Sequence, residues 1–209
     1  MAGRLPIIDE SSRAAPRRRL LIATGAAGLL VACGEQKKAA FNSIDVTGAS
    51  FGQGFSLPDF NGQVRTLADY KGKVVALFFG FTLCPDACPT TLLKLSEVAK
   101  SLGPDADRLQ VVFITIDPER DTPELLKNYV PAFNPAFIGL RGTVEQTAEV
   151  AKAYKAYYNK VKGSTPASYT FYHSTFTYLY DPQGRLRLMA RHEIDAGALA
   201  ADVKALLRG

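Results

Sequence analysis

The stretch that decides the fold is KVVALFFGFTLCPDACP, residues 73–89. Its first part, from Lys73 to Phe81, is a continuous apolar run of the kind that forms a central strand buried on both faces. Two cysteines follow, and Pro89 suits the first position of a helix. We therefore expect a strand that ends in a cysteine-bearing loop and leads directly into a helix.

Strands and helices are expected to alternate on the C-terminal side of this stretch, which indicates an α/β fold. The first helix should bury an apolar face. That face consists of Leu92, Leu95, Val98, Ala99 and Leu102. The later elements expected are a strand over Leu109–Ile116, a helix capped by Thr122 with Pro123 at its first position, a short strand over Ala136–Leu140, and a helix that opens at a Thr143–Gln146 capping box.

That last helix is expected to run towards Tyr158, with Val144, Ala148, Ala151 and Tyr154 facing inward. A β-hairpin over Thr175–Tyr180 and Arg185–Arg191, and a helix over Ala196–Leu207, should close the chain. On the N-terminal side, the Asn61-Gly62 turn predicts another hairpin. The order suits a thioredoxin-like fold with an N-terminal β-hairpin and a C-terminal β-hairpin plus helix.

The N-terminal leader resembles an export signal. Three arginines, Arg17–Arg19, precede an apolar run over residues 20–32, which is too short to span a bilayer but suits a signal-peptide core. The run ends in a Leu-Val-Ala-Cys sequence that resembles a bacterial lipobox, and the arginines loosely resemble a twin-arginine signal. The alternatives are an uncleaved anchor or cleavage without lipid. The expected organisation is a signal peptide over 1–32, an acylated Cys33 with a tether over 33–50, and a domain over 51–209 in the periplasm or outside the cytoplasmic membrane.

Much of the positive charge lies in this leader. The formal net charge is +5, and residues 1–19 carry five arginines against Asp9 and Glu10, a net of +3. Residues 20–32 carry no charge, so +2 remains for the rest of the chain. A nucleic-acid-binding function therefore has little support.

Beyond Cys33 the chain has two cysteines, Cys84 and Cys88, at the expected junction between strand and helix. The positive end of a helix dipole stabilises a thiolate, which can act as nucleophile or metal ligand. Their spacing lets both sulfurs point to one place. They could therefore close a Cys84–Cys88 disulfide or bind one soft metal ion together. An inert structural disulfide is the alternative, although so short a loop restrains little chain.

Two thiolates favour Cu(I), zinc or iron–sulfur chemistry, and an added imidazole gives a donor set suited to copper as Cu(I) or Cu(II). His173 lies just before the last expected hairpin, where a loop could approach the cysteines. His192 lies at the far end of that hairpin in a polar setting, where we expect a solvated surface residue. Position alone leaves His173 open, either as a ligand or as a hydrogen-bonded loop histidine.

Three segments together resemble the Sco/SenC family in order and spacing. They are FGFTLCPDACP (79–89), TIDPERDTP (115–123) and YHS (172–174), within a resemblance that covers about residues 51–207. The resemblance implies a thioredoxin-like copper protein that assists assembly of the dinuclear copper centre of cytochrome c oxidase. It implies ligands at Cys84, Cys88 and His173. The implied partners are the copper-binding subunit of the oxidase and other periplasmic copper carriers, with the membrane reached through the lipid anchor.

Two positions depart from the family's pattern. Family members commonly have a histidine or another polar residue before the first cysteine, where this chain has Leu83. They often have aspartate before the ligand histidine, where this chain has Tyr172. Groups around the ligands tune a metal site, so we expect the affinity and redox potential to differ from the family's usual values. The charged segment over 117–121 is interpreted either as a docking or ligand-supporting surface, or as a turn that shapes the next helix.

Three functions remain open from the sequence. The first is a metallochaperone, which passes its copper to a cysteine pair on a partner and has no catalytic turnover. The second is a thiol–disulfide reductase that uses Cys84 and Cys88 as its redox pair. The third is a redox or copper sensor. His173 separates the first two, because the metal needs an imidazole and thiol exchange does not.

Overall fold

The structure, a computed structural model, describes residues 40–164 and 168–209. The predicted signal peptide, Cys33 and residues 34–39 of the predicted tether lie outside the described residues. Among the residues that are described, no helix combines the length and the apolar character needed to cross a membrane.

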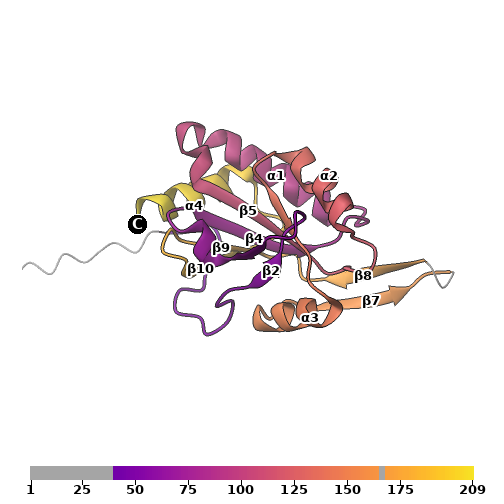
Figure 1. Cartoon of the computed structure of the whole chain (residues 1–209). Coiled ribbons are helices and arrows are strands. Elements are labelled where there is room, and N and C mark those ends of the chain that lie inside the picture. The colour runs from indigo at the N-terminus through magenta and orange to yellow at the C-terminus, as the bar shows by residue number, and fades with distance from the viewer. Residues whose placement is uncertain (1–39, 165–167) are drawn as a thin grey trace, which may run out of the picture. The chain divides into compact units, whose positions relative to one another are not determined.

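A six-stranded sheet forms the centre of the fold (Figure 1). Its order is β1–β10–β9–β4–β5–β6. The two central strands, β4 (Val74–Gly80) and β5 (Leu109–Thr115), pair in parallel, and every residue of both is buried, as their apolar runs predicted. The outer strands are β6 (Ile138–Leu140), β9 (Thr177–Tyr180), β10 (Leu186–Ala190) and β1 (Ile44–Asp45).

In the part of the chain that the structure describes, two small hairpins stand outside this sheet. The predicted N-terminal hairpin is present as β2 (Ser56–Pro58) and β3 (Val64–Thr66), with Gly62 at a φ of 81° in its turn. A second hairpin, which the sequence did not predict, pairs β7 (Tyr158–Lys162) with β8 (Tyr169–His173). The short 3-10 helices are η1 (Leu67–Tyr70) and η2 (Gly103–Arg108).

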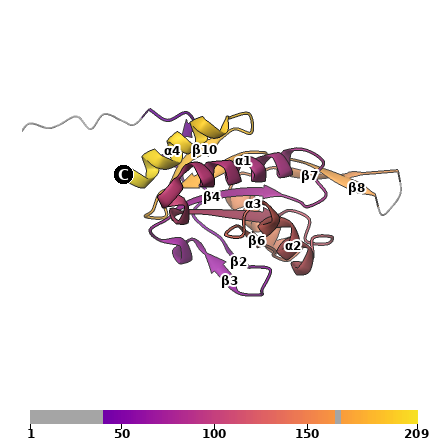
Figure 2. The same ribbon diagram turned by 90° about the horizontal axis from the view of Figure 1, so that it is seen from above.

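Within the described residues the chain forms four α-helices, which pack on the sheet (Figure 2). They are α1 (Ala87–Ser101), α2 (Pro123–Phe133), α3 (Val144–Ala153) and α4 (Ala196–Arg208). Both views show α1 and α4 side by side. Successive strand residues point to opposite faces. Gly80 of β4 faces Cys88 of α1, whereas Phe79 packs against Tyr154 at the end of α3, so α1 and α3 cover opposite faces.

The local start signals of two helices are confirmed. Thr122 accepts a hydrogen bond from the Leu125 N–H at the start of α2, and Thr143 forms the expected capping box with Gln146 at the start of α3. The start of α1 is different, because the helix begins at Ala87 and Pro89 occupies its third position. A proline fits there because the first-turn N–H groups have no partner within the helix.

The predicted end of α3 was wrong, and its predicted inner face was right only at Ala151 and Tyr154, which are buried. The helix stops at Ala153, because Lys155 adopts a left-handed φ of 54° that cannot continue it. Its buried positions include Thr147 and Ala151, whereas Val144 is 50% exposed. Ala148 is exposed as well. A polar threonine therefore replaces two apolar residues on the inner face, which is why the apolar pattern was misleading.

The fold also begins before Phe51, the expected boundary of the domain. β1 lies in the segment predicted as a tether and pairs antiparallel with β10. Asp202 of α4 accepts hydrogen bonds from the N–H groups of Asn42 and Ser43. So short a strand has no sequence periodicity, and its partners lie at the other end of the chain.

Candidate metal centre

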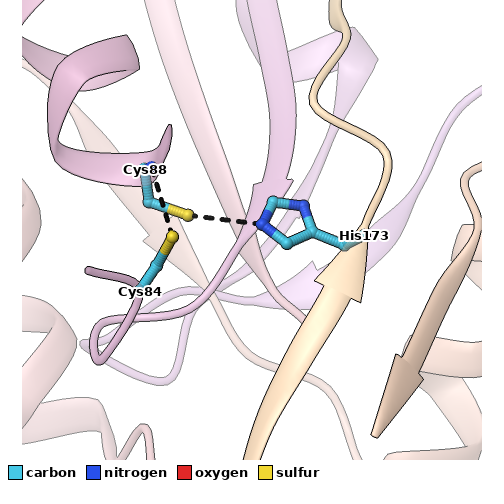
Figure 3. Close-up of side chains that lie close together, drawn as sticks. All are labelled: Cys84, Cys88 and His173. Carbon is cyan, nitrogen blue, oxygen red and sulfur yellow. Dashed lines mark hydrogen bonds between the residues drawn. The ribbon is translucent and has the colours of Figure 1, made fainter. Parts of the chain in front are cut away.

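Three potential metal ligands meet at one end of β4. Cys84 lies in the loop after this strand, Cys88 lies in the first turn of α1, and His173 is the last residue of β8. Their side chains point toward one another (Figure 3). Their ligand atoms all lie within 4.8 Å of one another, and the Cys88 Sγ is 3.7 Å from the His173 Nε2.

The cysteine loop is folded tightly enough to bring both sulfurs to one side. The Cys84 N–H donates to the Phe81 carbonyl at 3.2 Å, which closes a turn after the strand. The Cys88 N–H donates to the Cys84 Sγ at 3.4 Å, so the first sulfur lies at the N-terminal end of α1. Both cysteines are free thiols. The Cys84–Cys88 disulfide therefore remains a prediction for the oxidised protein.

The two thiols have different environments. Cys88 is 1% exposed, whereas Cys84 is half-buried. Hydrogen bonding from the Cys88 thiol, helped by His173, lowers the pKa of Cys84 well below its ordinary value. The same hydrogen bond, together with burial, raises the pKa of Cys88. In the metal-free protein Cys84 is therefore the thiol that ionises more readily, and Cys88 is the one that keeps its proton to higher pH.

Local contacts fix the orientation of the His173 imidazole. Its Nδ1 lies 2.9 Å from the Ser174 carbonyl, which can only accept, so Nδ1 carries the proton. The Nε2 atom then faces the sulfurs, where it can donate a hydrogen bond to Cys84 when protonated and bind a metal ion when it is not. The ring also packs edge-on against Phe81, at 5.9 Å between centroids. His173 is thus held in a strand rather than in the loop that the sequence predicted.

The separation of Cys88 and His173 suits a single ion. With the bond lengths of zinc, about 2.3 Å to sulfur and about 2.0 Å to nitrogen, one ion can join a sulfur and a nitrogen up to about 4.3 Å apart. The 3.7 Å between Cys88 and His173 is within this limit. Two thiolates and one imidazole favour a soft ion such as Cu(I) and also serve Cu(II).

The charged segment over 117–121 is hydrogen-bonded to the loop that carries the cysteines. Asp121 is fully buried and accepts hydrogen bonds from the Thr82 N–H and from the Thr82 and Thr115 hydroxyls. Burial raises the pKa of Asp121. Thr82 lies two residues before Cys84, so this carboxyl group reaches the cysteine loop. The sequence identified the segment but not these partners, because only the fold brings Thr82 and Thr115 to it.

The other residues singled out from the sequence lie around the site or apart from it. Leu83 and Tyr172, which precede two of the candidate ligands, are 60% and 70% exposed. His192 is not the freely solvated residue that was expected. It is half-buried, and its Nδ1 lies 3.1 Å from the Thr91 hydroxyl of α1. It is not among the three residues that form the candidate metal group.

Comparison with known proteins finds a matching family and related sequences. A family model described as SCO1/SenC matches residues 45–208. The chain is 39% identical over 169 residues to a SCO2-like protein of Rickettsia felis, an alignment that covers 79% of this chain and 82% of that protein.

Solved structures with the same fold are also found. The structure of Bradyrhizobium japonicum ScoI with copper bound has a TM-score of 0.68 and 40% identity, covering 76% of this chain and 99% of that one. The solution structure of apo Sco1 from Thermus thermophilus has a TM-score of 0.71 and 37% identity, covering 80% and 97%. These likenesses confirm the predicted thioredoxin-like α/β fold.

Proposed function

Because this chain belongs to the SCO1/SenC family, we propose that it is a metallochaperone that binds copper and delivers it to the dinuclear copper centre of cytochrome c oxidase. The ligands in this proposal are Cys84, Cys88 and His173. The observation that carries it is the convergence of two sulfurs and one imidazole nitrogen within 4.8 Å. The structure of Bradyrhizobium japonicum ScoI with copper bound, which is 40% identical to this chain, supports the choice of copper as the metal.

The arrangement suits transfer as well as binding. Cys84 is half-buried rather than enclosed, so a thiolate from an acceptor can approach the ion from its side. Three protein ligands leave a coordination position for that incoming sulfur. The acceptor's cysteine pair would then replace the donor's ligands one at a time, and Cys88, which is 1% exposed, would be displaced last.

Anaerobic loading tests the delivery. The reduced protein is loaded with Cu(I), mixed with the copper-free oxidase subunit, and separated from it before copper is measured in each fraction. We expect copper in the subunit fraction. Copper that stays with this chain, under conditions in which the subunit takes up copper from a small chelate, would contradict the proposal.

The ligand role of His173 is tested by substitution. His173→Ala should abolish stable Cu(II) binding and the sulfur-to-copper absorption band. Without the imidazole, the two sulfurs alone are a poor ligand set for Cu(II). His192→Ala is the matched control and should keep both, since His192 contacts Thr91 rather than the sulfurs. Wild-type stoichiometry and absorption in His173→Ala would remove this residue from the ligand set.

A second function, reduction of the acceptor's cysteines, is favoured by the different exposure of the two free thiols. In this reaction the Cys84 thiolate attacks a partner disulfide, forms a mixed disulfide and releases one partner thiolate. Cys88 then loses its proton and attacks the Cys84 sulfur. This second step forms the Cys84–Cys88 disulfide and releases the second partner thiolate. Two electrons pass to the partner.

Trapping separates this function from copper delivery. Cys88→Ser should accumulate a mixed disulfide through Cys84, visible as a covalent adduct by mass spectrometry, whereas Cys84→Ser should not. His173→Ala should leave this reduction mostly intact. If neither cysteine variant forms an adduct with an oxidised acceptor, the reductase function is excluded for that acceptor.

We further propose that the domain is held at the bacterial cell envelope, outside the cytoplasmic membrane, through lipid on Cys33. The support is the apolar run that ends in Leu-Val-Ala-Cys at residue 33. Mass spectrometry of the mature N-terminus should find a diacylglyceryl group on Cys33. An unmodified peptide spanning residues 20–45 would contradict this anchor.

A further inference from the structure

The imidazole and the sulfurs belong to parts of the fold that no shared strand ladder connects. His173 ends β8, whose hairpin with β7 forms a separate two-stranded sheet. Figure 1 shows this hairpin extending away from the six-stranded sheet. The cysteines follow β4, a central strand of that larger sheet. A short backbone link joins them, because only three residues separate His173 from β9, whose Thr177 pairs with Phe78 of β4. Beyond this link, side-chain contacts set the distance between the two halves of the metal site.

On the hairpin side of this connection, Arg120 and Asp117 hold Tyr169, the first residue of β8. The Arg120 guanidinium lies 3.5 Å from the centroid of the Tyr169 ring, and its Nη1 donates to the Tyr169 carbonyl at 2.9 Å. The Tyr169 hydroxyl donates to Asp117 at 2.8 Å, and the Arg120 Nε donates to the same carboxylate at 2.5 Å. The ring, the backbone carbonyl and the hydroxyl group of Tyr169 are thus all held by Arg120 or Asp117.

Tyr169 is linked to His173 by side-chain packing along one face of β8. Residues two apart in a strand point the same way, so Tyr169, Phe171 and His173 share a face. Tyr169 packs edge-on against Phe171, with 5.7 Å between the ring centroids. Phe171 and His173 both pack against Phe81, just after β4. A displacement of Tyr169 would therefore be transmitted to the imidazole.

The other side of the connection is Asp121. Its carboxyl group accepts the Thr82 hydroxyl at 2.5 Å and the Thr82 N–H at 3.1 Å, two residues before Cys84. It also accepts the Thr115 hydroxyl at 2.5 Å, at the end of β5. The position of the cysteine loop is therefore tied to Asp121.

The contacts to the hairpin and to the cysteine loop both start from one short turn, residues 117–121, which is held by hydrogen bonds of its own. The N–H groups of Arg120 and Asp121 both donate to the Asp117 carbonyl, at 3.2 and 2.9 Å. The Asp117 N–H donates to the Thr115 hydroxyl at 3.0 Å. We propose that residues 117–121 are a positioning segment, which ties the histidine hairpin to the cysteine loop and so sets the separation of the three ligands. None of these residues is proposed to bind the ion.

This inference rests on the proposed copper site, and the hairpin side of the segment tests it most directly. Arg120→Lys keeps the charge but loses the planar group that stacks on Tyr169 while contacting Asp117. Tyr169→Phe keeps the ring and removes only the hydroxyl. We expect Arg120→Lys to weaken Cu(II) binding by about 10–100-fold, the range for groups that orient metal ligands, and Tyr169→Phe to weaken it less.

The matched control is Arg108→Lys, because Arg108 pairs with Asp105 at an exposed position. Copper affinity by competition titration and the nitrogen splitting in the Cu(II) electron paramagnetic resonance spectrum are the readouts. A purely structural role would lower the melting temperature without changing that spectrum. Unchanged affinity and nitrogen splitting in Arg120→Lys, with wild type binding normally, would overturn the inference.

The loop side gives a second, distinguishable result. Asp121→Asn keeps the shape of the side chain but replaces one acceptor oxygen with a donor, so one of the threonine contacts is lost. We expect it to weaken both Cu(I) and Cu(II) binding, because it acts through the cysteine loop. Arg120→Lys should affect Cu(II) more than Cu(I). Equal effects of both variants on the two oxidation states would contradict the division of roles.

A measurement without copper keeps this inference separate from the proposed function. In the metal-free protein, the nuclear Overhauser effect between Phe81 and His173 should weaken in Arg120→Lys and persist in Arg108→Lys. If wild type binds no copper, the proposed function fails, and this contact still tests the positioning segment. An unchanged Phe81–His173 contact in Arg120→Lys would refute the segment's role.

Discussion

At the scale of single residues, the Cys88 sulfur occupies space that a larger residue at position 80 would fill. A methyl group on Gly80 would lie 2.6 Å from the Cys88 Sγ and 2.8 Å from the Phe113 ring, both of which are buried. Gly80→Ala should therefore displace this sulfur, weaken copper binding, and cost about 1–3 kcal/mol of stability through overpacking. Copper titration and chemical denaturation measure the two effects.

Gly139→Ala is the matched control for that substitution. A methyl group there would lie 3.2 Å from Val130 and 3.4 Å from Leu126, so it also crowds the core, but away from the cysteines. It should lower stability while leaving copper affinity unchanged. Equal losses of affinity in both variants would mean that Gly80 acts through general stability alone.

A second prediction at this scale concerns the reactivity of Cys84 as a function of pH. Hydrogen bonds from Cys88 and His173 lower its pKa from the ordinary 9.0, so the thiolate persists as the pH falls until the lowered pKa is reached. Iodoacetamide should therefore label Cys84 in the reduced protein well below pH 9.0, and faster than Cys88, whose pKa is raised. Peptide mass spectrometry across a pH series gives both rates.

His173→Ala supplies the control for this labelling. Because the imidazole contributes to the lowered pKa, its removal should shift the Cys84 labelling profile toward higher pH. The His192→Ala profile should match that of wild type. Labelling of wild-type Cys84 that begins only near pH 9.0 would contradict the thiolate assignment.

At the scale of elements, the turn between β9 and β10 depends on a buried carboxylate. Asp181 is 2% exposed and accepts hydrogen bonds from the N–H groups of Gln183 and Arg185, and from the Arg185 and Arg187 side chains. Burial alone would raise the pKa of Asp181, but these donors together lower it. A lowered pKa means that the carboxylate contributes stability above its ordinary pKa, which is lost as the pH falls through the folded value.

Asp181→Asn tests this contribution. At neutral pH the variant should be less stable by about 1–3 kcal/mol, because charged hydrogen bonds are replaced by weaker ones and one donor is left facing an amide N–H. The deficit should shrink as the pH falls below 3.8, the ordinary pKa of the group. Urea unfolding over an acidic pH series measures it. A deficit that stays constant across the series would show that the charge does not matter.

The elements that the sequence predicted correctly have local causes. The runs that became β4 and β5 are buried on both faces, and the caps at Thr122 and Thr143 need only a partner three residues away. The hairpin β7–β8 was missed because none of its residues is fully buried, so neither strand forms an apolar run, and the exposed positions of β7 include lysines. The aromatic residue outside the hairpin that it packs against, Phe81, lies far away in the sequence, so a local pattern does not show this contact.

At the scale of the whole molecule, the site could be predicted only in part. The cysteines could be paired from their spacing, because they lie in one loop. His173 is 85 positions away from Cys88, and its place beside the sulfurs depends on the complete fold. The assignment of His173 as a ligand came from the family resemblance, because its position in the sequence alone left open whether it is a ligand or a hydrogen-bonded loop histidine. The role of the 117–121 segment needed the fold as well, since its partners come from the loop after β4, from β5 and from β8.

The connection between the two ends of the chain gives the last prediction. β1 pairs with β10, the Val46 N–H donates to the Arg187 carbonyl at 2.9 Å, and buried Asp202 accepts the N–H groups of Asn42 and Ser43, both at 2.8 Å. A chain that starts at Phe51 would lose all of these contacts. Compared with residues 40–209, it should be less stable by roughly 1–3 kcal/mol or more, because Asp202 loses its donors and an edge of the sheet is uncovered.

Copper binding distinguishes this loss from general damage. None of the lost contacts involves a ligand residue or the 117–121 segment, so the shortened chain should keep wild-type copper affinity while it remains folded. Asp202→Asn in the longer chain should reproduce only part of the destabilisation, since the β1–β10 ladder is retained. If the chain starting at Phe51 is as stable as the longer one, residues 40–50 add nothing to the fold. The domain boundary would then lie where the sequence alone placed it.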